Sequence, residues 1–237
     1  MEKENNHPYL LFTAIIISGI LIAGAIIYKN GGSGAEGVNS ARENIFNKSG
    51  EGENANNETN RKATPEGEGD DPVLGNPEAP LTMVIFGDFQ CHFCRKLELE
   101  IRPLIVEKYV KTGKLKIIAR DFPFLGKNSI LAAQAANCAF EQNKYWEYSD
   151  ILHKKQNENA IELSKENLKF AAKEIGLTEK DFNECLNSDK YLSEVKNDFE
   201  DGKALGVSGT PTSFINEEVV PGAQPYAEFE KIIEALL

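Results

Sequence analysis

Residues 86–94, Phe-Gly-Asp-Phe-Gln-Cys-His-Phe-Cys, decide the fold because they join two stretches of different hydrophobic period. Before them, residues 81–86 are rich in Leu, Val and Ile, which predicts a buried strand. After them, apolar residues recur at helical spacing at Leu97, Ile101 and Ile105. The sequence therefore predicts that Cys91 and Cys94 lie where a strand ends and a helix begins.

The C-x-x-C spacing of these two cysteines predicts redox chemistry. A helix N-terminus carries unpaired N–H groups and about half a positive charge. A thiolate at that position is stabilised, so we expect the pKa of Cys91 to fall. Cys94 is close enough to form and break a disulfide with Cys91. Zinc binding is the metal alternative, but the sequence has no second short-spaced ligand pair, and we expect no metal site.

Composition narrows the function classes. The chain has 237 residues and a formal net charge of −11, and its Lys and Arg residues do not cluster. We therefore expect no nucleic-acid surface. Four cysteines are too few for a disulfide scaffold in a chain of this length, and their spacings fit two separate pairs.

The first 71 residues do not have the pattern of a folded domain. Residues 9–28, from Tyr9 to Tyr28, carry no charge, and about 20 residues at roughly 1.5 Å each span a ~30 Å bilayer core. We expect a cytoplasmic segment over 1–8 and a transmembrane anchor over 9–28 that attaches the chain to the cell membrane. A cleaved signal peptide is the alternative, although the apolar run exceeds the usual ~7–15 residues. Residues 29–71, rich in Gly, Asn and Glu and ending at Asp70-Asp71, are predicted to be a disordered linker.

Residues 72–237 show an α/β pattern. Strands are predicted over 81–86 and 115–119, joined by a helix that Pro103 should kink, and such a crossover predicts parallel strands. Helices are then predicted over 129–142, 144–155, 164–176, 178–186 and 188–205, strands over 212–216 and 219–220, and a last helix over 225–237. The fold class is α/β with a helical subdomain inserted at about 127–205.

Three motifs carry a family resemblance. They are Gly75-Asn76-Pro77-x-Ala79-Pro80, Asp88-Phe89-Gln90-Cys91-x-x-Cys94 and Gly206-Val207-Ser208-Gly209-Thr210-Pro211-Thr212. Together they resemble the DsbA-like branch of the thioredoxin superfamily, in particular its membrane-anchored or secreted bacterial thiol–disulfide oxidoreductases. The resemblance implies a thioredoxin-like fold with a helical insert. It also implies a cis peptide at Thr210-Pro211 that faces the cysteine pair and binds substrate peptide.

Neighbours of the cysteines leave alternatives open. In many relatives, a buried acid at the position of Ile85 relays the proton of the resolving cysteine, which is Cys94 here. In this chain, water or another group must take that proton. Asp88 is interpreted as a turn or helix-start residue first and as a proton relay second. His92 can add positive charge that lowers the pKa of Cys91, with Phe93 completing the dipeptide, or it can be an exposed side chain of modest effect.

The remaining sites belong to the insert. Cys138 and Cys185 are either buried free thiols or a structural disulfide, and the resemblance supports the disulfide. Such a bond requires an oxidising compartment, which places the domain outside the cytoplasm. His153 is expected to be solvated or to cap its helix. The aromatic residues of the second insert helix, Tyr145, Trp146 and Tyr148, are expected to be insert core and surface.

The resemblance implies an extracytoplasmic oxidoreductase that introduces disulfides into exported proteins through Cys91 and Cys94. It needs no cofactor beyond that redox-active disulfide. A membrane quinone-linked oxidase of the DsbB or VKOR kind would reoxidise the pair. The alternatives are a disulfide isomerase or reductase of the same fold, and a non-catalytic peptide-binding module.

Overall fold

The computed structural model describes residues 65–66, 71–159 and 161–237. The predicted cytoplasmic segment and membrane anchor lie outside the described residues, as does nearly all of the predicted linker. None of the helices in the described part of the chain has the length and apolar character needed to cross a membrane.

The centre of the domain is a five-stranded sheet in the order β1-β3-β2-β4-β5. The strands are β1 Val73–Leu74, β2 Leu81–Gly87, β3 Leu115–Asp121, β4 Thr212–Ile215 and β5 Glu218–Pro221. Strands β2 and β3 are parallel, as predicted, and pair from Leu81↔Leu115 to Gly87↔Asp121. The other pairs are antiparallel. Strand β1 was not predicted, because two residues are too few to show a period of two.

One long helical stretch connects β2 to β3. It consists of α3 His92–Lys96, η1 Leu97–Ile101, α4 Arg102–Ile105 and η2 Val106–Val110, of which η1 and η2 are π-helical. Pro103 was predicted to kink this helix, and the helix has a wider, π-helical turn just before it. The N–H of Arg102 donates to the carbonyl of Leu97, five residues back, just before the proline that has no N–H to offer.

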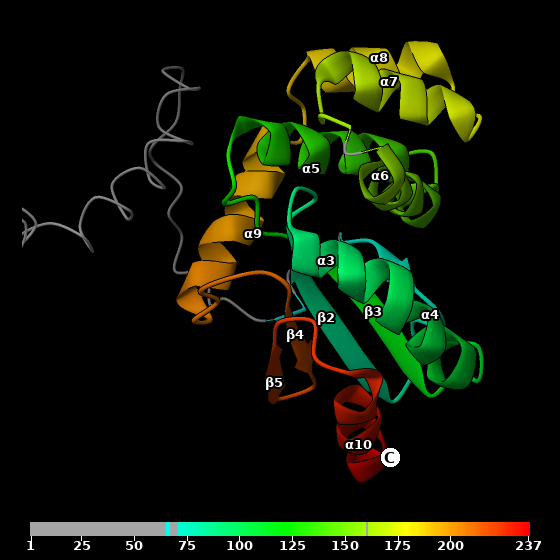
Figure 1. The fold of residues 1–237 in the computed structure, drawn as a ribbon, viewed down its shortest axis with the longest axis vertical. Helices are drawn as coiled ribbons and strands as arrows, with labels where there is room; N and C mark the ends of the chain where they lie inside the picture. The colour runs from blue at the N-terminus through cyan, green and yellow to red at the C-terminus, as the bar shows by residue number, and fades with distance from the viewer. Residues whose placement is uncertain (1–64, 67–70, 160) are drawn as a thin grey trace, which may run out of the picture. The chain divides into compact units, whose positions relative to one another are not determined.

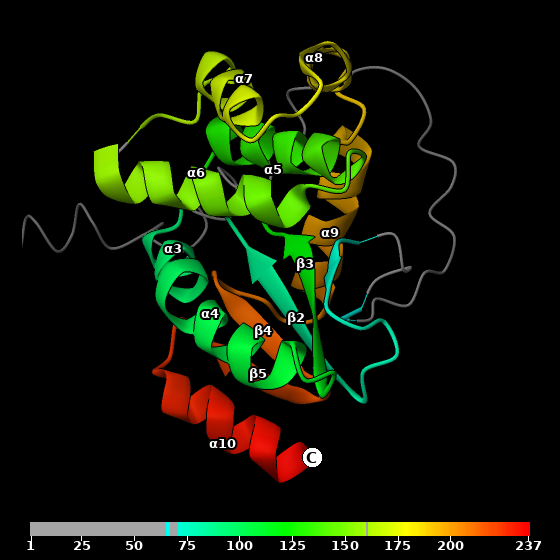
Figure 2. The same ribbon diagram turned by 90° about the vertical axis from the view of Figure 1, so that its right-hand side faces the viewer.

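Helices cover both faces of the sheet (Figures 1 and 2). On one face, β2 packs against the α3–η2 stretch and α10 Tyr226–Leu236. The buried residues there include Leu81, Met83, Ile85, Leu97, Ile101, Ile105, Phe229 and Ile233. On the other face lies α9 Leu192–Ala204, where Phe199 contacts Phe122, and Phe122 contacts Phe86 edge-on.

The helical insert has a hydrophobic core of its own. Its helices α5 Lys127–Phe140, α6 Tyr145–Asn159, α7 Lys165–Glu174 and α8 Glu179–Asn187 gather beyond one end of the sheet (Figure 1). Ser164 caps α7 by accepting from the N–H of Asn167, as the sequence pattern indicates. Helix α9 begins at Leu192 rather than at Ser188, because Asp189 has a positive φ of 52° and the chain turns there.

Two cysteines of the insert are joined. A disulfide links Cys138 on α5 to Cys185 on α8, with Cα atoms 5.8 Å apart. Both residues are buried among the apolar side chains of the insert core. Tyr148 lies in the same core, and its hydroxyl donates to the carbonyl of Leu168. The bond therefore ties together two helices of the insert and does not cross to the sheet.

Candidate active site

Cys91 and Cys94 lie at the carboxyl end of β2. Strand β2 ends at Gly87, the chain turns over four residues, and Cys91 is the N-cap residue of α3. The N–H of Cys91 donates to the carbonyl of Asp88, which closes the turn. Both cysteines are free thiols, and both are buried, with 7% and 3% of their surfaces exposed. The predicted placement between strand and helix is what the structure shows.

The Thr210-Pro211 loop faces this pair. The peptide bond between the two residues is cis. The sulfur of Cys91 lies 3.2 Å from the carbonyl oxygen of Thr210, across 119 residues of sequence, and donates to it when protonated. Strand β4 begins directly after the loop, and its first residue, Thr212, pairs with Phe86 of β2. Pairing of β4 with β2 thus holds the loop beside the start of α3.

The two thiols differ strongly in acidity. The pKa of Cys91 is lowered to about 5, chiefly because the Cys94 thiol donates to its sulfur. Thr210 and the N–H groups of Phe93 and Cys94 add to this, against the opposing effect of burial. Burial raises the pKa of Cys94 well above its ordinary value, and the neighbouring Cys91 sulfur adds to the effect. At neutral pH, Cys91 is a thiolate and Cys94 is a thiol.

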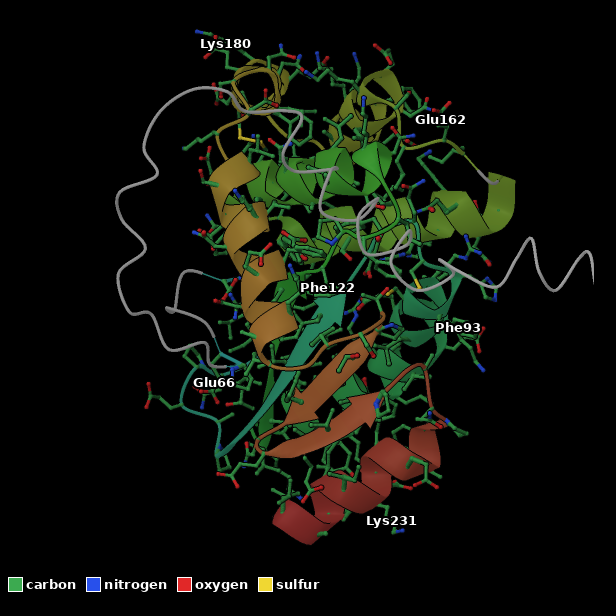
Figure 3. All side chains as sticks on the ribbon, turned by 90° about the vertical axis from the view of Figure 1, so that its left-hand side faces the viewer. Glu66, Phe93, Phe122, Glu162, Lys180 and Lys231 are labelled. Atoms are coloured by element: carbon green, nitrogen blue, oxygen red, sulfur yellow. A yellow bond between two sulfur atoms is a disulfide. The ribbon has the colours of Figure 1, made fainter. Side chains whose placement is uncertain are left out.

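His92 and Phe93 are both exposed. His92 is exposed, and its Nδ1 lies 2.8 Å from a guanidinium nitrogen of Arg95. Phe93 is 58% exposed at the rim of the domain (Figure 3). Phe93 acts on Cys91 through its backbone N–H. The effect of the His92 imidazole on Cys91 stays a prediction.

Asp88 holds the turn, as predicted. Its carboxylate accepts from the N–H of Gln90 at 2.8 Å and from the N–H of Leu125 at 3.0 Å. Its own N–H donates to the sulfur of Cys94 at 3.4 Å. Asp88 is only 2% exposed, and burial raises the pKa of its carboxyl. A single turn residue therefore connects the cysteine pair to the segment that follows β3.

A small cavity of about 30 Å³ lies behind Cys94. Its lining includes the acidic side chains of Asp88, Glu98 and Asp121. The other polar side chains that line it belong to Arg120, Tyr145, Trp146, Ser149 and His153. Trp146 Nε1 and His153 Nδ1 are both buried and have no hydrogen-bond partner within the described protein. A polar cavity needs about 10–15 Å³ to hold a water that satisfies such atoms. The volume of this cavity is sufficient for one water, although apolar side chains such as Ile85 and Leu97 form much of its lining.

His153 is a correction to the sequence analysis. It was expected to be solvated or to cap its helix, but it is 3% exposed and stacks on Phe89 with ring centroids 5.3 Å apart. Burial lowers the pKa of its imidazole to about 3, so the ring is neutral. The missed signal is positional: His153 follows Leu152 on the helical stripe that also contains Tyr145 and Tyr148.

Asp121 is a cavity residue that the sequence did not point to. It is the last residue of β3 and pairs with Gly87, the last residue of β2. It therefore lies at the end of the sheet where the turn that carries the cysteines begins. Its carboxylate accepts from the Asn137 amide at 2.7 Å, and its N–H donates to Asp198 at 2.9 Å. Burial, reinforced by the negative charge of Asp198, raises the pKa of Asp121 to about 8. The available signal was a charged residue at the carboxyl end of a predicted parallel strand.

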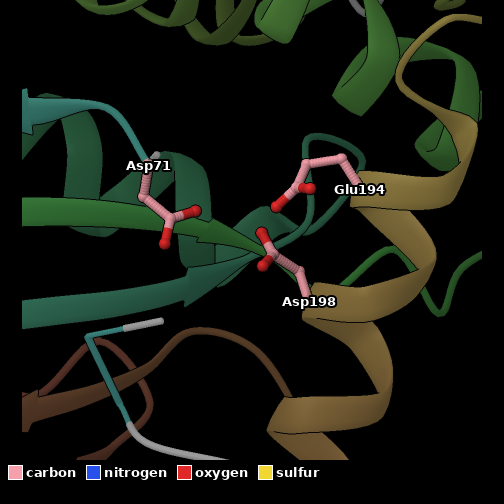
Figure 4. A group of neighbouring side chains, drawn as sticks. All are labelled: Asp71, Glu194 and Asp198. Carbon is pink, nitrogen blue, oxygen red and sulfur yellow. The ribbon is translucent and has the colours of Figure 1, made fainter. Parts of the chain in front are cut away.

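Next to Asp121 is a cluster of buried and partly buried charged side chains. Carboxylate oxygens of Asp71, Glu194 and Asp198 lie within 4.8 Å of one another (Figure 4). The guanidinium of Arg120 pairs with Asp198 at 2.5 Å and with Asp201 at 2.8 Å, and its Nε lies 3.5 Å from Asp71. Arg120 therefore supplies positive charge to the group, which we interpret as an ion-pair cluster. Asp71, expected to end the linker, is instead buried at 7% exposure by this pairing.

Comparison with known proteins assigns the family. The Thioredoxin family model matches residues 68–235, and the chain belongs to that family. Its fold, its dithiol and its relatives define it further as a DsbA-like thiol–disulfide oxidoreductase.

Three relatives illustrate the likeness. Probable disulfide bond formation protein D of Bacillus cereus is 31% identical over 148 residues, which cover 60% of this chain and 68% of that protein. The crystal structure of oxidised BdbD from Bacillus subtilis is 28% identical with a TM-score of 0.66, covering 70% of this chain and 92% of that one. The crystal structure of Wolbachia pipientis alpha-DsbA1 is 27% identical with a TM-score of 0.63, covering 70% and 90%.

Proposed function

We propose that this protein introduces disulfides into exported proteins through Cys91 and Cys94. The observation that carries the proposal is the asymmetry of the pair. The pKa of Cys91 is lowered to about 5, so Cys91 is a thiolate at neutral pH, while burial keeps Cys94 a thiol. A disulfide whose reduced form is stabilised in this way is a strong oxidant, because its reduction is favoured.

The reaction takes place in two exchanges. A substrate thiolate attacks the Cys91 sulfur of the Cys91–Cys94 disulfide, the S–S bond breaks, and its electron pair goes to Cys94, which takes up a proton. A second substrate thiolate then attacks the substrate sulfur of the mixed disulfide and expels Cys91 as a thiolate. The substrate loses two electrons and gains a disulfide, while the enzyme pair becomes a dithiol. The low pKa of Cys91 makes it a good leaving group in the second exchange.

The Thr210-Pro211 loop is the proposed substrate-binding element. Its carbonyl oxygen lies 3.2 Å from the Cys91 sulfur, so a peptide bound along the loop would bring its own sulfur to Cys91. An extended peptide can pair with free backbone groups of this kind. The exposed Phe93, two residues after Cys91 in the first turn of α3, offers apolar surface near the dithiol.

The second cysteine pair supports the proposed location. The Cys138–Cys185 disulfide supports a location outside the cytoplasm, where such bonds persist. The apolar residues 9–28 fit a membrane anchor in that setting, with the catalytic domain on the extracytoplasmic side. Reoxidation of Cys91 and Cys94 then falls to a membrane quinone-linked oxidase of the DsbB or VKOR kind.

Two serine variants test the assigned roles. With a reduced, unfolded model protein as substrate, Cys91→Ser should abolish thiol oxidation, because no attackable sulfur remains at position 91. Cys94→Ser should instead accumulate mixed disulfides with the substrate under mild oxidation, detected as mass adducts on Cys91. Absence of adducts in Cys94→Ser, or their presence in Cys91→Ser, contradicts the roles.

The direction of the reaction is tested by a redox titration of the pair against glutathione. Reduction potentials in this superfamily run from about −270 mV in reductants to about −120 mV in strong oxidants. We expect a value in the upper part of this range because the dithiol is stabilised. A value more negative than about −230 mV would favour the isomerase or reductase alternative.

A further inference from the structure

Each exchange at the dithiol requires Cys94 to gain or lose a proton, and Cys94 is poorly placed to trade it with solvent. Its side chain is 3% exposed, and its sulfur lies under the turn, accepting from the N–H of Asp88. Burial makes the charged form of Cys94 unfavourable. A thiolate that is expelled there, or a thiol that must attack from there, needs a nearby group that gives or takes the proton.

The cavity behind Cys94 offers the path. Cys94 and Asp121 both line it, and it has room for water. Two of its other lining residues, Trp146 and His153, contribute buried ring nitrogens without protein partners. Buried polar atoms without protein partners beside a cavity large enough for water favour the retention of a water there. Water in this cavity can carry a proton between Cys94 and the acids around it.

Among the titratable groups facing the cavity, Asp121 is the one suited to exchange a proton. Asp88 uses both carboxylate oxygens to hold backbone N–H groups, and Glu98 is paired with Arg102 at 2.5 Å. His153 is neutral and stays so over the working range because its pKa is about 3. Asp121 has a single side-chain donor, Asn137, and its pKa of about 8 lies near the operating pH.

We propose that Asp121 exchanges the proton of Cys94 through water held in the cavity between them. When a substrate thiolate breaks the Cys91–Cys94 bond, the electron pair goes to Cys94 and the Asp121 carboxyl proton moves through water to that sulfur. In the reverse exchange, the Asp121 carboxylate takes the proton as Cys94 attacks a mixed disulfide on Cys91. Solvent restores the protonation of Asp121 between turnovers. This inference rests on the proposed function of the dithiol.

The two cysteine steps can be measured separately. The reduced full-length protein is mixed with a limiting amount of dithiobis(nitrobenzoic acid), which releases a coloured thiolate at each attack. Attack by Cys91 is the concentration-dependent first phase, and attack by Cys94 on the resulting mixed disulfide is the concentration-independent second phase. General-base assistance contributes about 10²–10⁴-fold where it operates directly. Acting through water, Asp121→Asn should slow the second phase at least about tenfold at pH 7 and leave the first within about twofold.

The pH profile separates proton exchange from a structural role. The titratable and charged groups around Asp121 come from several elements. They are Asp88 on the turn, Glu98 on η1, Arg120 on β3, Tyr145 and His153 on α6, and Glu194 and Asp198 on α9. In the wild type, the rate of the second phase should rise as Asp121 ionises. In Asp121→Asn it should rise only with ionisation of the Cys94 thiol itself. Asn137→Ala keeps the carboxyl but removes its donor, so the wild-type midpoint should move to higher pH.

Matched variants make the outcome decisive. Asp88→Asn and Glu98→Gln change acids on the same cavity, and Asp181→Asn changes an exposed acid on α8. A second phase unchanged within twofold in Asp121→Asn, or slowed more by Asp88→Asn or Glu98→Gln, overturns the inference. If Asp121→Asn does not fold, an unshifted midpoint in Asn137→Ala overturns it equally. Loss of the first phase in the wild type would instead contradict the proposed function of the dithiol.

Discussion

At the scale of the residue, the site is built from one donor network around the Cys91 sulfur. The thiol of Cys94 and two N–H groups at the start of α3 stabilise its negative charge. The same arrangement leaves Cys94 buried beneath it. The pKa of Cys91 is therefore lowered and the pKa of Cys94 is raised by the same local arrangement of hydrogen bonds and burial.

This network predicts how Cys94 variants change Cys91. The rate of Cys91 alkylation by iodoacetamide should follow a titration with a midpoint near pH 5, since the pKa of Cys91 is lowered to about 5. Cys94→Ala removes the donor with the largest effect, so the midpoint should rise. Cys94→Ser keeps a hydroxyl donor and should retain much of the lowering. Equal midpoints in Cys94→Ala and the wild type would show that the helix N-terminus alone sets the acidity of Cys91.

Sequence reasoning identified the site residues whose roles depend on local pattern. Cys91 and Cys94 follow from their spacing, and the turn role of Asp88 follows from its place before them. Asp121 and His153 could not be assigned in the same way, because their burial depends on elements that meet only in three dimensions. Asp121 is enclosed by contacts with Asn137 of α5 and Asp198 of α9. His153 is covered by the ring of Phe89.

At the scale of the element, the insert is held by its own disulfide and core. The Cys138–Cys185 bond closes a sequence separation of 47 residues between α5 and α8. The predicted boundaries of α5, α7 and α8 were accurate to about two residues, because apolar spacing and the Ser164 cap are local signals. Helix α6 ends at Asn159, four residues beyond its predicted end. The short strand β1 and the late start of α9 depend on pairing with β3 and on a left-handed turn residue, which no period reveals.

The insert disulfide should contribute substantially to stability. In the chain-entropy model, a loop of this length stabilises the fold by roughly 4 kcal/mol. The double variant Cys138→Ala/Cys185→Ala should therefore lose about 3–4 kcal/mol in the free energy of unfolding, measured by urea denaturation. A reductant strong enough to open the bond should bring the wild type to the level of the variant. A loss below about 1 kcal/mol would mean that the insert core holds α5 and α8 together without the bond.

At the scale of the whole molecule, buried acids link folding to pH. The pKa of Asp121 is raised to about 8 in the folded protein, above the ~3.9 of an unfolded aspartate. Such a group stabilises the fold fully below the unfolded pKa, and the contribution is lost as pH rises through the folded value. The relevant window therefore runs from about pH 4 to about pH 8.

The disulfide form should show this dependence without interference from the two active-site thiols. The free energy of unfolding of the wild type, relative to Asp121→Asn, should fall on the order of 1 kcal/mol between about pH 6 and pH 8. Taking the difference between the two proteins cancels the contribution of His153, whose pKa is lowered. Urea denaturation of both proteins across this pH range measures the difference in their free energies of unfolding. A difference that does not change with pH would contradict the raised pKa of Asp121.

The chain passes between sheet and insert twice, and both passages border the dithiol. In the segment that leads from β3 to the insert, the N–H of Leu125 donates to Asp88. In the segment that returns to β4, the carbonyl oxygen of Thr210 lies within hydrogen-bond distance of the Cys91 sulfur. A third link is the Gln156 amide of α6, which donates to the carbonyl of Phe89 at 2.6 Å. A small rotation of the helical insert relative to the sheet would thus change several contacts around the Cys91 sulfur together. Changes on its outer helices can retune the chemistry from a distance.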